Sequence, residues 1–419
     1  MRREWIMRTP TEVAKLSHEH TGTAGTAPLS RRRFVGVVAI GLVGLRQQGA
    51  GRRSERDSVV FVGTYTTDGR SQGIHLLRMD RDTGTLRAAG VAIAAANPSF
   101  LAVSPSERFL YAVNELTEFE GAPSGAVSAF AVDAATGGGR LTLLGRRASR
   151  GGAPCYVTID RTGRFALVAN YVGGSVAVLP ISADGSLGEA TSVVQHKGTG
   201  PNPERQRSPH AHCIVLDPAN RYALVADLGI DRVVVYRFDA QAGTLSPAAT
   251  SDAVLRPGAG PRHLAFHPSG RMVYVTNELD STLTAFHYSP KTGALREAQT
   301  VSTLAKGIAQ PNAPADVHVS PSGRFVYVSN RGHDSIAVFA IHAKSGMLSL
   351  IELVSTGGKW PRNFAMDPTG RFLFVANQRS DSITGFRIDP RSGRLTPAGK
   401  PIELPVPVCI RFASGNRGA

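Results

Sequence analysis

The chain has 419 residues, of which 42% are hydrophobic, and its formal net charge is +15. Residues 1–56 hold 11 Lys or Arg and 4 Asp or Glu, so this segment accounts for +7 and leaves +8 for the other residues. That remaining charge is diffuse, without a Lys/Arg block that contains aromatic residues, and this pattern excludes a typical nucleic-acid-binding surface.

The first 56 residues resemble an export signal and not part of a folded domain. Ser30, Arg31, Arg32 and Phe34 lie in the register of a twin-arginine signal, and they lead into FVGVVAIGLVGL, a run of 12 mostly apolar residues. This run has signal-peptide length and is too short to span a bilayer as a helix. We predict an exported protein, periplasmic or extracellular, that contacts the membrane only through this signal. An ordinary secretion signal, an uncleaved anchor and, if the signal is not used, a cytoplasmic protein are the alternatives.

An internal repeat occupies most of the chain after this segment. Six near-copies consist of an apolar run, a turn ending in Arg and a second apolar run: SPSERFLYAVN, DRTGRFALVAN, DPANRYALVAD, HPSGRMVYVTN, SPSGRFVYVSN and DPTGRFLFVAN. Their Arg residues follow one another at offsets of 56, 57, 50, 53 and 47 residues. In the unit that contains HPSGRMVYVTN, two further strand-like runs, STLTAFHY and REAQTVST, follow this hairpin. Each unit therefore predicts four antiparallel strands, which is typical of a β-propeller blade.

The two ends of the repeat region supply one more blade. Residues 57–94 offer three strands and residues 405–412 offer one. We therefore predict an all-β, seven-bladed β-propeller with four antiparallel strands per blade, closed by a C-terminal strand that joins the N-terminal blade. The predicted organisation is an N-terminal extension (1–56), the propeller (57–412) and a short tail (413–419).

The chain has 3 cysteines, Cys155, Cys213 and Cys409, each near the start of a unit's first strand. An odd count without a CxxC pair argues against a disulfide framework or a thiolate zinc site. We expect three repeat-equivalent, buried thiols.

Functional residues should lie where a unit departs from its neighbours, because the repeated residues are mostly scaffold. Two first strands begin with unusual polar residues, and two second strands end with charged ones. These departing residues are His210, His212, Arg262, His263, Glu278 and Arg331. A first strand starts where its antiparallel second strand ends, so all these positions share one face of the disc near its axis. We predict a polar pocket over the fourth, fifth and sixth blades.

Several of these segments resemble one family. GTGPNPERQRSPHAHCIVLDP (residues 198–218), GPRHLAFHPSGR, YVTNEL, YVSNRG, NPSFLAVSP and YAVNEL are similar to the propeller-type lactonases, which include 6-phosphogluconolactonase and carboxymuconate-lactonizing enzyme. The resemblance covers about residues 57–412. It implies a site that needs neither a metal nor a cofactor. It also implies a catalytic set of His210 or His212, Arg262, Glu278 and Arg331, which the repeat alignment had already singled out.

These residue types suit the opening of a lactone by water. His210 or His212 would take the proton of the water, because His titrates near neutral pH. Arg262 and Arg331 would stabilise the oxyanion and hold a carboxylate or phosphate of a small anionic substrate. Glu278 would stay ionised and orient the His or pass a proton to the leaving alkoxide. The expected substrate contacts are Arg205 and Gln206 of a Pro-rich loop, His263, Asn277 and Asn330.

Structural and functional alternatives remain beside this interpretation. His210 and His212 alternate along a strand, so one should face the pocket and the other should pack or form a hydrogen bond. No third ligand follows them in a recognisable spacing, so we predict no metal site. Arg262, Glu278 and Arg331 could also form a structural ion-pair network that seals the axial channel.

Two other functions fit parts of the sequence. YVTN at residues 274–277 is typical of non-catalytic binding propellers of the cell envelope, although such a propeller should lack the four site motifs together. A muconate-type cycloisomerase is the other alternative. Export would favour an unphosphorylated lactone, because sugar phosphates are cytoplasmic. We expect a monomer or a weak homo-oligomer.

Overall fold

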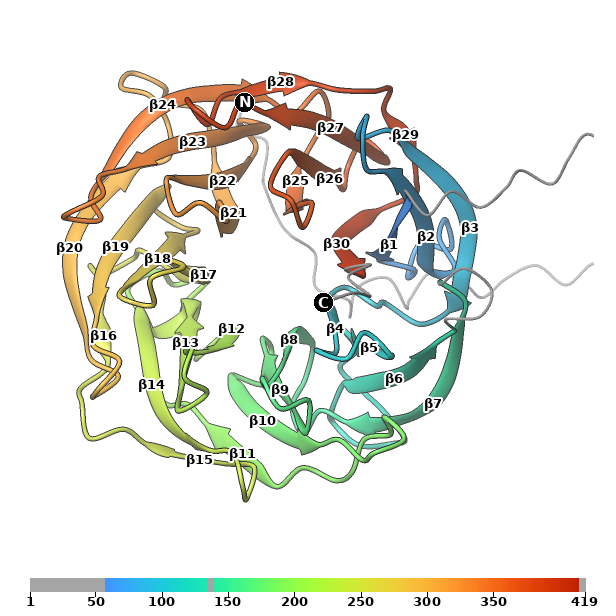
Figure 1. Cartoon of the computed structure of the whole chain (residues 1–419). Coiled ribbons are helices and arrows are strands. Elements are labelled where there is room, and N and C mark those ends of the chain that lie inside the picture. Colours follow the sequence, from blue (N-terminus) through green and yellow to red (C-terminus); the bar gives the residue numbers. More distant parts are fainter. Residues whose placement is uncertain (1–56, 134–138, 414–419) are drawn as a thin grey trace, which may run out of the picture. The chain divides into compact units, whose positions relative to one another are not determined.

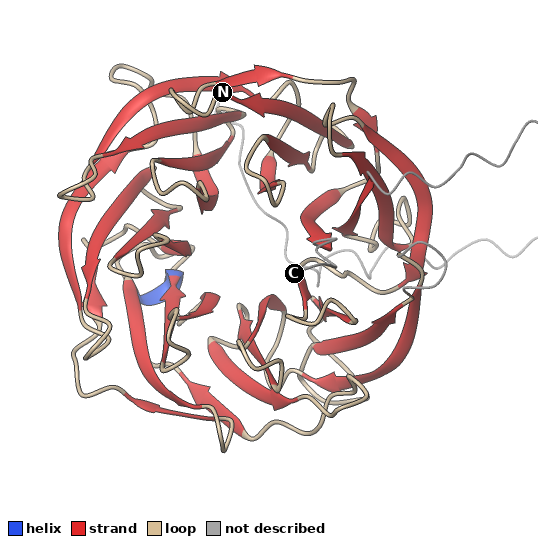
Figure 2. Cartoon of the chain, in the orientation of Figure 1, coloured by secondary structure: helices blue, strands red, loops and turns tan. Residues whose placement is uncertain are grey.

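The computed structural model describes residues 57–133 and 139–413, which form seven β-sheets arranged as a ring around a central axis (Figure 1). Regular structure in these residues is almost entirely strand (Figure 2), apart from one short 3-10 helix, η2 (Leu228–Ile230). Within the described ranges, no helix has the length and apolar character needed to cross a bilayer. The predicted export signal at residues 30–45 lies outside the described residues.

Blade 1 joins the two ends of the described chain, as predicted. β1 (Asp57–Thr64) pairs antiparallel with β30 (Pro407–Ala413) on its inner side and with β2 (Gly73–Asp80) on its outer side. β3 (Leu86–Ala94) completes the sheet outside β2. The ring is therefore closed by backbone hydrogen bonds between the first and the last described strands.

Blades 2 to 7 repeat this plan, with the strands ordered from the axis outward. Blades 2 to 4 consist of β4 (Leu101–Val103), β5 (Phe109–Asn114), β6 (Ala126–Val132) and β7 (Leu141–Ala148); β8 (Pro154–Ile159), β9 (Phe165–Asn170), β10 (Ser175–Pro180) and β11 (Ser192–Gln195); and β12 (Ala211–Leu216), β13 (Tyr222–Asp227), β14 (Arg232–Asp239), β15 (Thr244–Pro247) and β16 (Ala253–Val254). Blades 5 to 7 consist of β17 (Pro261–Phe266), β18 (Met272–Asn277), β19 (Thr282–Tyr288) and β20 (Leu295–Ser302); β21 (Ala313–Val319), β22 (Phe325–Arg331), β23 (Ser335–Ile341) and β24 (Leu348–Ser355); and β25 (Pro361–Met366), β26 (Phe372–Asn377), β27 (Ser382–Ile388), β28 (Leu395–Pro397) and β29 (Ile402–Glu403). In blades 4 and 7 the outermost strand is interrupted, so two short strands pair with the third.

Neighbouring blades cover each other's apolar faces, which is why the middle strands are buried on both sides. Tyr274 and Leu283 of blade 5 and Val326 and Phe339 of blade 6, for example, belong to the same buried cluster. The repeated turn arginines add polar links, because each of five donates to a carbonyl of the next blade. The donors Arg108, Arg164, Arg221, Arg324 and Arg371 contact Ala183, Ala240, Pro290, Pro390 and Arg81, in that order. These arginines are scaffold, as the repeat indicated.

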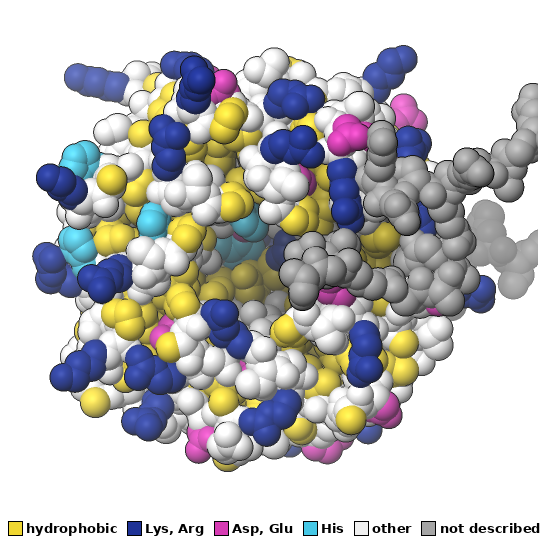
Figure 3. Space-filling model, in the orientation of Figure 1, with side chains coloured by type: hydrophobic (Ala, Val, Ile, Leu, Met, Phe, Trp, Pro, Cys, Tyr) yellow, Lys and Arg dark blue, Asp and Glu magenta, His cyan; other side chains and the backbone are white. Residues whose placement is uncertain are grey.

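The surface charge follows the same repetition. On the face drawn in Figure 3, Lys and Arg side chains are spread around the ring and do not form one block. Because the turn arginines recur once per blade, a diffuse positive charge is the expected result.

A β-bulge near the start of the inner strand recurs in six blades and shapes the centre of the ring. In blade 3, Pro154 faces Asn170 and Tyr156 faces Ala169, so Cys155 is the extra residue. The same register shift adds one residue to the inner strands of blades 1, 4, 5, 6 and 7. We call the extra residues the bulge residues: Cys155, His212, Arg262, Ala315, Arg362 and Val408. Bulges re-aim side chains and are frequent beside active sites.

The bulges also correct one expectation about the cysteines. Cys213 faces Ala226 and Cys409 faces Gly63, which are equivalent positions, whereas Cys155 lies one position earlier, in the bulge. The three are therefore not all repeat-equivalent, because a bulge shifts the register without leaving a mark in the apolar pattern. All three are buried, free thiols.

Candidate active site

Glu278, which follows β18, is the centre of a buried ion-pair cluster. Its Oε1 accepts a hydrogen bond from Arg205 Nη2 at 2.8 Å. Its Oε2 lies 2.9 Å from Arg262 Nε and 2.7 Å from Arg331 Nη2. Glu278, Arg262 and Arg331 are each at most 3% exposed. Four separate segments of the chain thus meet at one point, and we call these four residues the Glu278 cluster.

Electrostatics keeps this cluster charged. Burial by itself would raise the pKa of Glu278, but the guanidiniums, that of Arg331 foremost, hold this pKa well below its usual range. Burial, followed by Arg331 and Arg362, lowers the pKa of Arg262 to about 9, so Arg262 is still cationic at neutral pH. Three guanidiniums face one carboxylate. The excess of positive charge favours an anionic ligand.

Arg262 and Arg331 both form close ion pairs with the same oxygen of Glu278. Arg262 Nε and Arg331 Nη2 are within 3 Å of Glu278 Oε2. Each guanidinium also donates to a backbone carbonyl of blade 6, Arg262 Nη1 to Ala315 O and Arg331 Nε to Ala313 O. One carboxylate oxygen is thus shared by two buried cationic donors.

Arg205 reaches the cluster from the loop between β11 and β12. Gln206 fixes this loop, because its Nε2 donates to Leu228 O and to Asp231 Oδ1 at 2.8 and 2.7 Å. Asp231 also accepts from the backbone N–H of Gly258 and Gly260, just before β17. One carboxylate thus connects the segment that carries Arg205 with the one that carries Arg262.

The two histidines of PHAH both contact the ring of Tyr171. His210 stacks on the Tyr171 ring at a centroid distance of 4.5 Å, and its Nδ1 lies 2.9 Å from Tyr171 O. A carbonyl only accepts, so Nδ1 of His210 carries the hydrogen. His212 contacts the same ring edge-on at 5.3 Å and is buried. Burial, followed by Arg262 and His263, lowers the pKa of His212 well below its usual value, so this imidazole is neutral.

A small cavity lies on the axis beside Arg262. Its volume is about 10 Å³, room for about one water molecule. We call it the axial cavity, and its lining residues are Ser99, Phe100, Cys155, His212, Arg262, His263, Arg362, Asn363 and Val408. Five of these nine are bulge residues, so the bulges direct the side chains of different blades toward one space.

His263 forms a buried pair with Asp316 of blade 6. Its Nδ1 lies 2.8 Å from Asp316 Oδ1, and Asp316 Oδ2 lies 3.1 Å from His318 Nε2. Burial and then Arg262 lower the pKa of His263 to about 3, although Asp316 opposes this shift. Burial would raise the pKa of Asp316, but His318 and His263 hold it well below its usual range. The pair is therefore an ionised Asp316 and a neutral His263 whose Nδ1 donates.

With this geometry established, comparison with known proteins places the chain. The family model described as "Lactonase, 7-bladed beta-propeller" matches residues 59–412. The chain belongs to this lactonase family. A 6-phosphogluconolactonase of Bacillus subtilis is 39% identical over 352 residues, which cover 84% of this chain and 97% of the relative. One from Formosa agariphila is 33% identical over 310 residues, 73% of this chain and 86% of the relative.

A solved structure of the propeller lactonase family shows the same architecture. The periplasmic gluconolactonase of Pseudomonas aeruginosa superimposes with a TM-score of 0.79 at 36% identity, and the match covers 85% of this chain and 99% of that protein.

Four predicted contact residues of this lactonase-family chain lie outside the Glu278 cluster: His263 borders the axial cavity, and the other three bond within the scaffold. Gln206 is fully buried, and its amide holds the loop as described above. Asn330 Nδ2 donates to Thr303 O, just after β20 of blade 5, and to Ser335 Oγ of blade 6. Asn277 Nδ2 donates to Thr282 Oγ1 and Thr284 Oγ1. Each of these three side chains forms hydrogen bonds within the scaffold, and none contacts the charged groups of the cluster.

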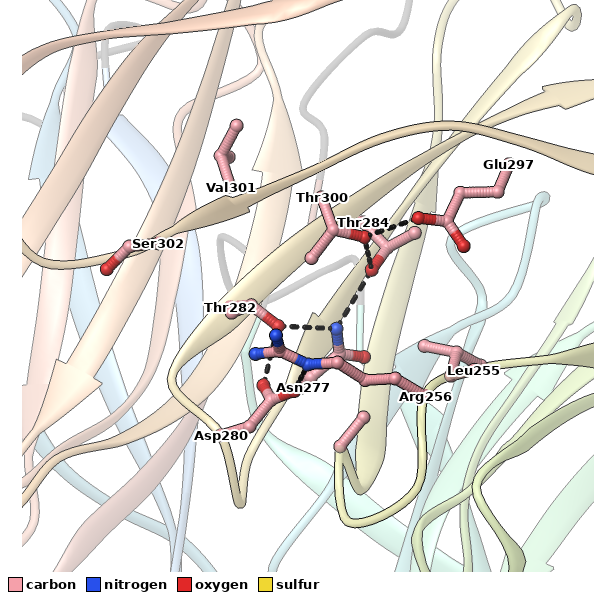
Figure 4. A pocket seen from close by; sticks show the side chains of 11 residues that line it. Leu255, Arg256, Asn277, Asp280, Thr282, Thr284, Glu297, Thr300, Val301 and Ser302 are labelled. Carbon is pink, nitrogen blue, oxygen red and sulfur yellow. Dashed lines mark hydrogen bonds and ion pairs between the residues drawn. The ribbon is translucent and has the colours of Figure 1, made fainter.

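Asn277 instead borders a larger groove of about 530 Å³ on the side of blade 5 (Figure 4). Its polar groups form one hydrogen-bonded series, Arg256, Asp280, Thr282, Asn277, Thr284, Thr300 and Glu297. The donors in this series are already paired with each other, and the groove contains no His. The groove is larger than the axial cavity, but none of the predicted catalytic residues lines it.

The structure adds residues that the motif analysis passed over. Arg362 borders the axial cavity, and its Cζ lies 5.4 Å from the ring centroid of Tyr65, whose hydroxyl donates to Glu115 Oε2 at 2.9 Å. Arg362 in WPRNF is equivalent to Arg262 in GPRHL. Glu115 in YAVNEL is equivalent to Glu278 in YVTNEL. The same alignment that singled out Arg262 and Glu278 therefore contained the signal for both.

Two further chemical possibilities at the site are a Cys155 nucleophile and a bound metal ion. Cys155 Sγ lies 3.7 Å from His212 Nδ1, and burial raises the pKa of this thiol well above its usual value. A thiol of this kind is not a nucleophile at neutral pH. In residues 57–133 and 139–413, no three His, Cys, Asp or Glu side chains are grouped to hold a metal ion.

Proposed function

We propose that the protein is a lactone hydrolase that opens a sugar-acid lactone at the Glu278 cluster. The carrying observation is the group of buried guanidinium donors around one carboxylate, Arg262 and Arg331 at Glu278, with Arg262 bordering the axial cavity together with His212. A carbonyl oxygen that becomes negative in the transition state would accept from them, and buried donors of this kind are effective because water does not compete. The named activity of the relatives supports the same reaction class.

The proposed reaction needs only water and the lactone. The water oxygen bonds to the carbonyl carbon, while His210 or His212 takes the water proton. The negative charge moves to the carbonyl oxygen and is stabilised by Arg262 and Arg331. The ring C–O bond then breaks, and the imidazolium returns the proton to the ring oxygen, which gives the open hydroxy acid. Glu278 is too acidic to carry a proton at neutral pH, so we assign it the role of holding the guanidiniums.

Hydrolysis of a panel of δ- and γ-lactones of sugar acids, with and without a 6-phosphate, tests this proposal. The wild-type protein should hydrolyse at least one class, and EDTA treatment should not change the rate. Arg262→Met should lower kcat by about 10² to 10³, the usual cost of losing one oxyanion donor. His210→Asn and His212→Asn identify the base, because only the loss of the base should lower kcat by a factor of about 10² or more.

His287→Asn is the matched control, because His287 lies on β19 and does not border the axial cavity. Its rate should equal that of the wild type. Equal rates for all variants would contradict the assigned residues. Formation of a lactone from an open unsaturated acid would indicate a cycloisomerase, and tight lactone binding without turnover would indicate a binding propeller.

We propose, separately, that the protein is exported through the twin-arginine motif at residues 30–35. The motif itself and the periplasmic gluconolactonase of Pseudomonas aeruginosa support this location. In a bacterial host with the twin-arginine pathway, cell fractionation should find the wild-type protein in the periplasm. Replacing Arg31 and Arg32 with Lys should keep it in the cytoplasm. Arg52 and Arg53, another pair of consecutive arginines, serve as the control, and replacing both with Lys should not affect export. If both double replacements kept the protein in the cytoplasm, the result would contradict a role for the motif.

A further inference from the structure

Besides Arg262 Nε, which lies 2.9 Å from Glu278, two buried polar atoms of residues that line the axial cavity lack a hydrogen-bond partner among the described residues. They are Ser99 Oγ of blade 2 and His263 Nε2 of blade 5. Both residues line the cavity, and they are 4% exposed. Leaving a buried polar group without a partner is energetically costly, so two of them in one cavity indicate a common ligand.

The chemistry of the two atoms defines this ligand. Since Nδ1 of His263 donates to Asp316, its Nε2 has a lone pair and can only accept. Ser99 Oγ can donate and accept. The cavity holds about one water molecule, and a buried water needs two to four polar partners. Water satisfies these conditions, whereas an anion cannot donate to His263.

Asp316 holds His263 in this orientation. Its Oδ1 accepts from His263 Nδ1 and from the backbone N–H of Val317, and its Oδ2 contacts His318 and Asn363. The carboxylate is therefore fixed from three neighbouring segments. Fixed in this way, Asp316 keeps the imidazole in one tautomer and one ring orientation.

We propose that Ser99 and His263 hold the water that attacks the lactone, and that Asp316 is a positioning residue for His263. The inference rests on the proposed hydrolysis. The water donates one hydrogen to His263 Nε2, and its second hydrogen faces the base. The substrate lies above, over the Glu278 cluster, because the cavity itself is too small for a lactone ring. The reaction consumes this water: its oxygen enters the acid product, and its proton passes through the base to the ring oxygen.

A double-mutant cycle in the full chain tests the shared water. Ser99→Ala and His263→Leu should each lower kcat about 10- to 100-fold and change KM by less than about twofold, because they misplace the nucleophile and leave lactone binding intact. The double variant should be no slower than the slower single variant, since both side chains act on one molecule. His263→Gln, whose amide can bond both Asp316 and the water, should regain most of the rate.

His267→Leu and Ser269→Ala form the matched control pair, since these residues bond to each other in an exposed turn. They should keep wild-type kinetics. A crystal structure of the wild-type protein gives a readout that is independent of activity, and it should show one water within about 3.2 Å of both Ser99 Oγ and His263 Nε2. No such water, or wild-type kcat in both single variants, would overturn the inference. A wild-type protein that hydrolyses no lactone, yet binds the water, would refute the proposed function and leave the hydration site standing.

Discussion

Glu278→Gln should lower the free energy of unfolding by about 3–5 kcal/mol, the usual cost of removing one partner from a buried ion pair. The amide keeps the shape of the side chain but removes the negative charge between three guanidiniums. Arg262 and Arg331 are almost inaccessible to water, so solvent cannot replace the carboxylate. Urea unfolding at neutral pH, followed by circular dichroism, measures the difference.

Two further variants separate charge from packing. Glu352→Gln removes a carboxylate whose partner, Arg394, is 57% exposed, and it should cost less than about 1 kcal/mol. Combining Glu278→Gln with Arg331→Met should be less destabilising than the sum of the single changes, because the second change removes one of the repelling charges. If Glu278→Gln were as stable as the wild type, the cluster would not depend on its carboxylate.

Truncation after Val406 should abolish cooperative folding of the propeller. It removes β30, which forms the inner strand of blade 1 and places Val408, Cys409 and Ile410 in the core. It also removes hydrogen bonds to both neighbouring blades, because Ile410 N–H donates to Asn363 and Arg411 Nε donates to Leu101 O. Thermal unfolding followed by circular dichroism should show a broad transition or none.

The matched control is truncation after Ala413, which keeps β30 and removes only residues 414–419. This shorter chain should melt like the full chain. A synthetic peptide of residues 404–413, added in excess to the Val406 truncation, should restore part of the sharp transition, because a single missing strand can be supplied by β-augmentation. An unchanged transition in the Val406 truncation would show that the closing strand is dispensable.

The architecture followed from the sequence because each blade repeats one apolar hairpin. Counting the units also predicted the closure, since residues 57–94 lacked one strand and residues 405–412 supplied one. The convergence of Arg262, Glu278 and Arg331 was equally predictable, because antiparallel pairing places the start of one strand beside the end of the next. The ion-pair network that the sequence offered as an alternative is present, and it is compatible with a site because its three guanidiniums around one carboxylate favour an anionic ligand.

The details of the site could not be predicted, because they depend on features that leave no periodic signal in the sequence. The bulge of blade 4 places His212 at the axial cavity, and the bulge of blade 3 shifts Cys155 out of register with Cys213. The alternation of apolar residues along a strand does not reveal such an extra residue. Asn277 and Asn330 adjoin charged site residues in the sequence, yet their amides bond to scaffold groups of the same or the preceding blade. Asp316 lies outside the quoted motifs, and Ser99 lies in NPSFLAVSP without differing from an ordinary strand residue. They become visible only through the hydrogen bonds that they form or lack.

The repeated bulge has an evolutionary consequence. Each extra residue is inserted between two ordinary backbone pairings, so a different side chain there leaves the register of the strand unchanged. Five of the six bulge residues line the axial cavity, so exchanges at these positions alter its lining while the surrounding sheets stay the same. Such a scaffold permits new substrate preferences to arise by single exchanges, one blade at a time.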